Sequence, residues 1–204
     1  MPTLGRRESL AERRERRAAI DDPAVVLEAA ARFLGVRSRS VAEVRRRLTG
    51  AGYRVDLVEG AIERMTELGM LDDEAFARAW VESRDRARPR GERAIREELR
   101  LKGVDRASID LVLAERREAV AGNDGGSPDI DGAPVSSADD VAARRLLARH
   151  RRSLERVADP WKRRQRAYAL LARNGFDPNV CNTVAATITQ ATTDELDDLV
   201  DPSL

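Results

Sequence analysis

The sequence predicts an all-α protein made of three tandem three-helix repeats that form an elongated, curved array. Apolar residues recur with the 3.6-residue period of a helix throughout the chain, and no segment alternates as a strand does. A motif of helix, glycine, apolar residue and second helix appears three times, around Gly52, Gly103 and Gly175, and the fourth residue before each glycine is a leucine. Repetition of one small helical unit is typical of stacked repeat proteins that bind long partners.

The three glycines are expected to end helices. Helices commonly end at a residue with positive φ, a conformation that costs residues other than glycine about 1 kcal/mol or more. We therefore expect Gly52, Gly103 and Gly175 to occupy equivalent turns between the second and third helices of their repeats.

Capping residues define the first repeat, residues 23–70. Asp22-Pro23 is a helix start, because proline is tolerated in the first turn, and Gly35 ends that helix. Ser40 followed three residues later by Glu43 forms a capping box for the second helix. That helix is expected to stop at 50–52, and the third to cover 55–68.

The same signals divide the other two repeats. In the second, residues 71–120, Asp72 or Asp73 caps a first helix that Pro89 and Gly91 end, followed by helices over about 92–102 and 108–120. In the third, residues 139–190, Asp139 or Asp140 caps the first helix. Its middle helix begins at Pro160-Trp161 and ends at Asn174-Gly175, and its last begins at Asp177-Pro178 and ends near Gln190.

Three segments lie outside the repeats. The arm, residues 1–22, mixes Arg with Glu and has too few apolar residues to order beyond a marginal helix. A Gly/Pro-rich acidic spacer, residues 121–138, is expected to be flexible and to let the third repeat reach a variable target. The tail, residues 191–204, carries five acids and no base.

Composition restricts the protein class. The formal net charge is +1, so overall charge argues neither for nor against nucleic acid. A single cysteine, Cys181, excludes a disulfide or a cysteine-based zinc site within the chain and is expected to be a buried structural thiol. No segment has the run of about 18 apolar residues that a membrane span needs, and the first 20 residues are too charged for a secretory signal. A cytoplasmic protein is expected.

The sequence offers no constellation for catalysis. His150, the only histidine, stands in a run of arginines and is not expected to be catalytic or to bind a metal. Asp72 and Asp73 are adjacent, but consecutive helix positions point about 100° apart and do not converge on a metal. There is no phosphate loop, no Ser–His–Asp set and no Cys–His pair. We therefore expect a protein that is not an enzyme and that needs no cofactor or metal.

Basic side chains concentrate in the second and third repeats. Between 141 and 176 there are eleven Lys and Arg residues against two acids. A solvated helix face is the default interpretation, and contact with phosphates or an acidic protein groove is the functional one, since arginine pairs bidentately with either anion. The candidate contact residues are Arg84, Arg86, Arg88, Arg90, Arg93, Arg144, Arg145, Arg163, Arg164 and Arg166.

Three ordered segments on this repeat frame, residues 71–77, 90–104 and 162–176, together resemble the RecX family, whose members regulate the RecA recombinase. Residues 71–77 resemble its "LDD..FA" signature, and residues 90–104 resemble its "G…I..EL..KG(I/V)" segment. Residues 162–176 resemble its basic helix that ends in glycine and phenylalanine. The resemblance extends over about residues 25–190, while the acidic spacer and the arginine-rich arm depart from the family pattern.

The resemblance implies a monomeric regulator that binds in the groove of the RecA–DNA filament. It implies modulation, usually inhibition, of filament growth, ATP hydrolysis and strand exchange in recombination, DNA repair and the SOS response, with DNA, single-stranded or double-stranded, as a second partner and no membrane. Two other functions fit the residues: a direct DNA-binding protein built of helix-turn-helix-like units, and a protein-only helical scaffold. Binding to naked DNA, compared with RecA-coated DNA, distinguishes the three.

Overall fold

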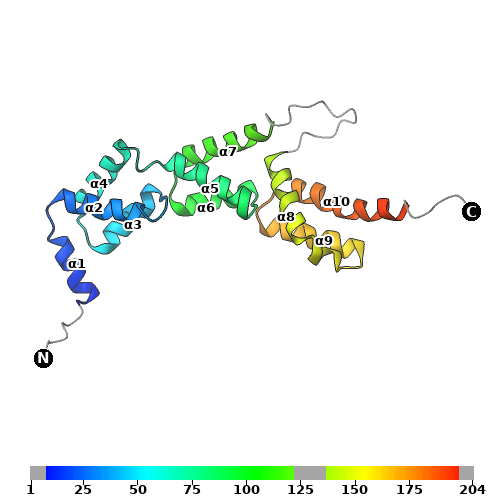
Figure 1. Ribbon diagram of the computed structural model, residues 1–204, viewed down its shortest axis with the longest axis horizontal. Helices are drawn as coiled ribbons and strands as arrows, with labels where there is room; N and C mark the ends of the chain where they lie inside the picture. The colour runs from blue at the N-terminus through cyan, green and yellow to red at the C-terminus, as the bar shows by residue number, and fades with distance from the viewer. Residues whose placement is uncertain (1–7, 122–136, 198–204) are drawn as a thin grey trace, which may run out of the picture. The chain divides into compact units, whose positions relative to one another are not determined.

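The computed structural model describes residues 8–121 and 137–197 and is helical wherever it has regular structure (Figure 1). The expectation of an all-α chain with three successive three-helix repeats is confirmed. The ten helices of the described part are α1 Leu10–Ala18, α2 Pro23–Leu34, α3 Val41–Ala51, α4 Val55–Glu67, α5 Asp73–Ala87, α6 Glu92–Lys102, α7 Arg106–Ala121, α8 Ala138–Glu155, α9 Pro160–Arg173 and α10 Pro178–Asp197.

The three predicted glycine turns are confirmed. Gly52 lies between α3 and α4 with φ +102°, Gly103 between α6 and α7 with φ +83°, and Gly175 between α9 and α10 with φ +80°. Each separates the second and third helices of its repeat and takes the left-handed conformation that glycine adopts without a Cβ penalty. The repeated sequence motif therefore corresponds to the same left-handed glycine turn in all three repeats.

Most predicted helix starts are also confirmed. Asp22 caps α2, Asp159 caps α9, and the Ser40–Glu43 capping box is complete. Of the two adjacent aspartates at the start of α5, Asp72 is the one whose carboxylate accepts from the first-turn amides, those of Glu74 and Ala75.

The structure corrects the expected ends of two helices and shows order in the arm. Ser137, not Asp139 or Asp140, is the N-cap of α8, and Asp140 completes its capping box. Helix α10 runs to Asp197 rather than ending near Gln190. In the arm, α1 begins with a capping box at Ser9 although none of its residues is buried. Residues 1–7, 122–136 and 198–204, which include most of the spacer and half of the tail, lie outside the described residues.

The chain divides into two compact units. Unit 1 comprises residues 1–77 with 100–108, and unit 2 comprises residues 78–99 with 109–204. The core of unit 1 is formed by α2, α3 and α4 around the fully buried Val26, Val44 and Val58. In unit 2 a core between α8, α9 and α10 contains Phe176 and Cys181, and the buried state expected of the cysteine is confirmed. Neither core relies on many aromatic rings.

One glutamate of unit 1, Glu43, has a lowered pKa and makes the stability of that unit depend on pH. Burial favours the neutral form of Glu43, but hydrogen bonds from the Arg37 and Lys102 side chains and from the Ser40 amide outweigh burial and lower its pKa from 4.5 to about 2. Because the folded pKa lies below the unfolded one, Glu43 stabilises the fold above pH 4.5, and this contribution is lost as the pH falls toward 2.

We expect Glu43→Gln to destabilise the protein at pH 7 by about 2 kcal/mol, since several charge-assisted hydrogen bonds weaken. The variant should also lose less stability than the parent between pH 4.5 and 2. Urea unfolding followed by circular dichroism across that range measures both effects, with Glu63→Gln, an exposed carboxylate, as the control. Identical acid profiles for parent and Glu43→Gln would contradict this assignment.

Candidate functional site: the arginines of the second and third repeats

The glycine turns of the second and third repeats also join each repeat to the one before it. Within unit 1, a Cβ placed on Gly103 would lie 2.3 Å from the Cβ of Ala42 near the start of α3. Within unit 2, a Cβ on Gly175 would lie 2.4 Å from the Cβ of Ala94 near the start of α6. In both places the turn of one repeat packs on the second helix of the repeat before it. Close backbone approach, besides positive φ, requires glycine here.

Two partly buried aspartates complete the junctions. The Asp73 carboxylate accepts from the amide of Val41, the first residue of α3, at 2.9 Å. The Asp139 carboxylate accepts from the amide of Glu92, the first residue of α6, at 3.0 and 3.1 Å. Burial raises the pKa of both aspartates, while these backbone hydrogen bonds oppose the shift. Each aspartate thus caps a helix of the preceding repeat, a role that its position at the start of its own helix did not reveal.

Arg116 of α7 forms the charged centre of unit 2. It is 7% exposed, donates to both carboxylate oxygens of Asp85 at 2.9 and 3.0 Å, and reaches Asp139 at 2.7 Å. Burial disfavours its charge, but these carboxylates outweigh burial and raise its pKa. Since Asp85 belongs to α5 and Asp139 to α8, one guanidinium connects the second repeat to the third.

The junction between the second and third repeats is therefore directly packed. The Gly91 amide donates to the Asn174 carbonyl at 3.0 Å, and Arg149 donates to backbone carbonyls at the end of α5. A Cβ on Gly91 would lie 2.3 Å from the carbonyl oxygen of Gly175. The expectation that the spacer frees the third repeat to reach a variable target is not met by these contacts.

Four of the ten candidate arginines bind groups within the protein. Arg84 pairs with Glu98 at 2.6 Å and stacks over the Trp80 ring, and Arg90 bonds to the side chain of Asn174. Arg163, one of the few buried charged residues, donates to the Val157 carbonyl. Arg86 is exposed but pairs with Glu82 one turn away. Arg163 is not a surface residue, and Arg84 and Arg90 hold unit 2 together.

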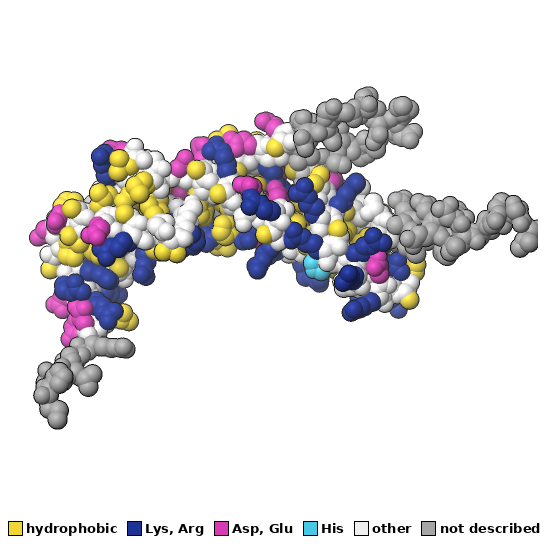
Figure 2. Space-filling model, in the orientation of Figure 1, with side chains coloured by type: hydrophobic (Ala, Val, Ile, Leu, Met, Phe, Trp, Pro, Cys, Tyr) yellow, Lys and Arg dark blue, Asp and Glu magenta, His cyan; other side chains and the backbone are white. Residues whose placement is uncertain are grey.

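The other six candidates are exposed, and none forms an ion pair with another described residue. Helix α8 carries two, α9 carries two, and the remaining two flank the start of α6. Figure 2 shows Lys and Arg side chains gathered over α8 and α9. These six, named the free arginines below, are Arg88, Arg93, Arg144, Arg145, Arg164 and Arg166.

Two of the free arginines line cavities on the surface of unit 2. Arg145 lines a cavity of about 350 Å³ between α5, α7 and α8. Arg164 lines one of about 200 Å³ with Tyr168 and Trp161, whose ring is 67% exposed. The sequence predicted that Trp161 begins a helix. It did not predict that the Trp161 ring lines the same cavity as Arg164.

The chemistry available here is anion binding. Within the described residues no group of three or more His, Cys, Asp or Glu side chains is arranged to hold a metal, and no helix is long and apolar enough to cross a membrane. Unpaired guanidinium groups on helices can pair with phosphates or carboxylates of a partner. The fold and this surface define a class: an all-α protein of tandem three-helix domains with an arginine-rich surface.

Comparison with known proteins identifies the family. Residues 27–65, 72–113 and 138–184 match the first, second and third three-helix domains of RecX. The regulatory protein RecX of Mycobacterium sp. (strain JLS) is 34% identical over 149 residues, 73% of each chain. The chain belongs to the RecX family.

Other relatives agree over shorter or more divergent alignments. The regulatory protein RecX of Mycolicibacterium smegmatis is 45% identical over 84 residues, 41% of this chain and 45% of that one, so the match spans less than half of that relative. The crystal structure of RecX from Lactobacillus salivarius aligns with a TM-score of 0.65 at 16% identity, covering 83% of this chain and 98% of that one. The latter likeness supports the fold alone.

Proposed function

We propose that this protein is a negative modulator of the RecA recombinase that binds in the groove of the RecA–DNA filament through the free arginines. It acts in the cytoplasm as a monomer, alters filament growth, ATP hydrolysis and strand exchange, and catalyses no reaction itself. Family membership supports a regulatory role. The observation that carries the proposed binding mode is the set of exposed arginines without acidic partners.

Two physical features fit this function. The second and third repeats pack directly on each other, so the free arginines are presented from one compact unit. Binding through such a unit loses less conformational entropy than binding through two domains that move separately. Several weak contacts on linked repeats raise apparent affinity through effective concentration. A long polyanionic or acidic groove is the kind of partner that such a surface suits.

We expect reversal of three free arginines to weaken inhibition. Arg144→Glu/Arg145→Glu/Arg164→Glu should raise the concentration that half-inhibits RecA's DNA-dependent ATPase at least about tenfold, because favourable charge contacts become repulsive. The fold should remain intact, since exposed charges contribute little to stability. The matched control is Arg152→Glu/Arg156→Glu/Arg173→Glu, which makes the same charge change from α8 through the end of α9 at exposed, unpaired positions. Equal inhibition by both triple variants would refute the assigned surface.

Salt dependence separates the two kinds of partner. If the free arginines meet DNA phosphates, binding releases counterions and weakens steeply with salt. If they meet acidic RecA side chains, binding depends less on salt and more on the guanidinium fork, so replacement by lysine is more harmful. Measuring binding to naked DNA and to RecA-coated DNA at several salt concentrations also tests the alternative of a direct DNA-binding protein.

A further inference from the structure

One large aromatic ring of unit 2 is open to solvent. The Trp161 ring, at the start of α9, is 67% exposed and forms no cation–π contact with another described residue. The other tryptophan, Trp80, lies under the Arg84 guanidinium at 4.3 Å and donates its indole N–H to Glu98. Trp161 thus offers a free aromatic face of the kind that is enriched at interfaces with other molecules.

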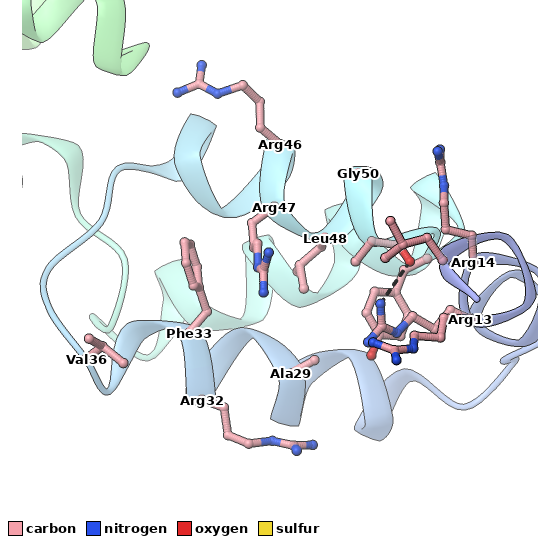
Figure 3. Close-up of a pocket in the computed structure, with 14 residues that line it drawn as sticks. Arg13, Arg14, Ala29, Arg32, Phe33, Val36, Arg46, Arg47, Leu48 and Gly50 are labelled. Atoms are coloured by element: carbon pink, nitrogen blue, oxygen red, sulfur yellow. Dashed lines mark hydrogen bonds between the residues drawn. The ribbon is translucent and has the colours of Figure 1, made fainter. Parts of the chain in front are cut away.

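The aromatic rings of the largest cavity in unit 1 are already covered. This cavity, of about 850 Å³, lies between α1, α2 and α3 and contains Phe33 and Tyr53 (Figure 3). Arg39 lies 4.2 Å and Arg47 lies 5.7 Å from the centroid of the Phe33 ring. Arg17 lies 5.6 Å from the centroid of the Tyr53 ring. Both rings therefore have guanidinium partners within unit 1.

The cavity beside Trp161 is lined by groups that can bind a nucleic-acid base. Its volume is about 200 Å³, and its lining consists of Trp161, Arg164, Gln165 and Tyr168 of α9 with Asn182 of α10. Aromatic rings stack on bases, and amide and guanidinium groups pair with base edges or phosphates. None of the described side chains in this lining is acidic or aliphatic. An aliphatic lining would instead suit an apolar segment of a protein partner.

The helical period places four of these side chains on one face of α9. Residues 161, 164, 165 and 168 follow the i, i+3, i+4, i+7 spacing of such a face. The two rings are two turns apart, about 10 Å along the helix axis, with the guanidinium and the amide between them. A strand can therefore stack a base on a ring while its phosphate meets Arg164, one of the free arginines. Because the bases of a duplex are already stacked and paired, this face suits a single strand.

The repeat pattern shows that this face differs from the packing surfaces of the earlier repeats. In α3 and α6 the glycine turn of the next repeat lies on Ala42 and Ala94. These alanines are the tenth and ninth residues before the glycines of their own repeats. The tenth and ninth residues before Gly175 are Gln165 and Arg166, and both are exposed. A close turn needs a small side chain beneath it, so this part of α9 suits a different kind of partner.

We propose that the Trp161 face of α9, formed by Trp161, Arg164, Gln165 and Tyr168, binds single-stranded DNA. A base stacks on Trp161, and Arg164 pairs with a phosphate. Residues 141–176 carry eleven Lys and Arg against two acids, which attracts a polyanion to this part of unit 2. The inference rests on the proposed function for its setting and deepens it by naming the partner of this face. Its test uses naked DNA without RecA, so its failure is distinguishable from failure of the RecA titration.

Fluorescence anisotropy of a labelled oligothymidylate of about 15 nucleotides, with the full-length protein, measures the contribution of Trp161. Trp161→Ala should weaken binding at least about fivefold because base stacking is lost, whereas Trp161→Phe should retain most of the affinity. Leu101→Ala, the matched control, removes another large apolar side chain that is 64% exposed and should leave the affinity within about twofold. The slope of log affinity against log salt should stay unchanged in Trp161→Ala and become about 0.7 less steep in Arg164→Ala.

Two further measurements separate stacking from general attraction. In a Trp80→Phe variant Trp161 is the only tryptophan, and the oligothymidylate should quench its fluorescence with saturation. Binding to a duplex should change less than about twofold in Trp161→Ala. No binding of the single strand, or equal affinities of Trp161→Ala and Leu101→Ala, would overturn the proposal. So would a Trp161→Ala protein that binds the oligothymidylate as the parent does but no longer inhibits RecA, because Trp161 would then contact protein.

Discussion

Gly91→Ala is expected to destabilise unit 2 by about 3 kcal/mol or more. A Cβ at this position would lie 2.3 to 2.4 Å from the Gly175 carbonyl group and the Phe176 amide nitrogen. Because these are backbone atoms, they cannot rotate away from the added methyl group, and the junction must open. Overpacking costs about 1–3 kcal/mol even where neighbouring side chains can move, so the cost here should be at the upper end of this range or above it. The Gly91 amide also donates to the Asn174 carbonyl across the same junction and would lose that bond.

Urea unfolding and amide hydrogen exchange measure this effect together. We expect a lower unfolding midpoint and faster exchange of the amide at position 91. Gly60→Ala is the control, because Gly60 is inside α4 and its added Cβ would have no atom within 4 Å beyond its chain neighbours and the backbone of its own helix. Alanine there should stabilise the protein by about 0.5–1 kcal/mol. A Gly91→Ala protein as stable as the parent would mean that the second and third repeats are not packed as described.

Arg116→Ala is expected to cost about 3 kcal/mol. Removing one member of a buried ion network leaves its partners uncompensated, and such losses are typically about 3–5 kcal/mol. Asp85 and Asp139 would both lose the guanidinium, although Asp85 is partly exposed, which places the cost toward the lower end. Thermal unfolding at pH 7 measures the change.

The matched control for this network is the next residue. Arg117 is 58% exposed at its side chain and forms one ion pair of 3.7 Å, so Arg117→Ala should change stability by less than about 0.5 kcal/mol. If the two variants unfold at the same temperature, Arg116 does not hold the second and third repeats together.

Local signals in the sequence predicted much of the fold. Helix starts at Asp22, Ser40 and Asp159 follow from side chains that cap nearby amides, and the glycine turns follow from a backbone conformation that other residues avoid. These features act within a few residues, so a single sequence contains them. The family resemblance, drawn from residues on this repeat frame, is confirmed by the matches to all three domains.

The junctions were not predicted because they depend on residues far apart in the chain. Asp139 was assigned to the cap of its own helix, whereas its carboxylate caps α6, 47 residues away. One signal for Arg116 was available: counted from the repeat glycines, its position holds Met65 in the first copy and Ile188 in the third. A charged residue at an otherwise apolar repeat position indicates a buried ion pair rather than a solvent-facing charge.

The same limit applies to the candidate surface. The runs of basic residues in the sequence show which segments are rich in arginine. They do not show which arginines already form ion pairs or hydrogen bonds within the protein. Arg84, Arg90 and Arg163 find partners through tertiary contacts or a local carbonyl, and only coordinates separate them from the free arginines. Whether the free arginines contact RecA or DNA stays a prediction.

A titration of RecA's ATPase on single-stranded DNA tests the central proposal most directly. Because filament growth is a shared property of many protomers, a regulator bound in the groove acts on more than the protomers it touches. We expect the full-length protein to lower the steady-state ATPase rate at well under one molecule per RecA protomer. An unchanged ATPase rate at equimolar protein, with strand exchange also unchanged, would contradict the assignment of this chain as a RecA modulator.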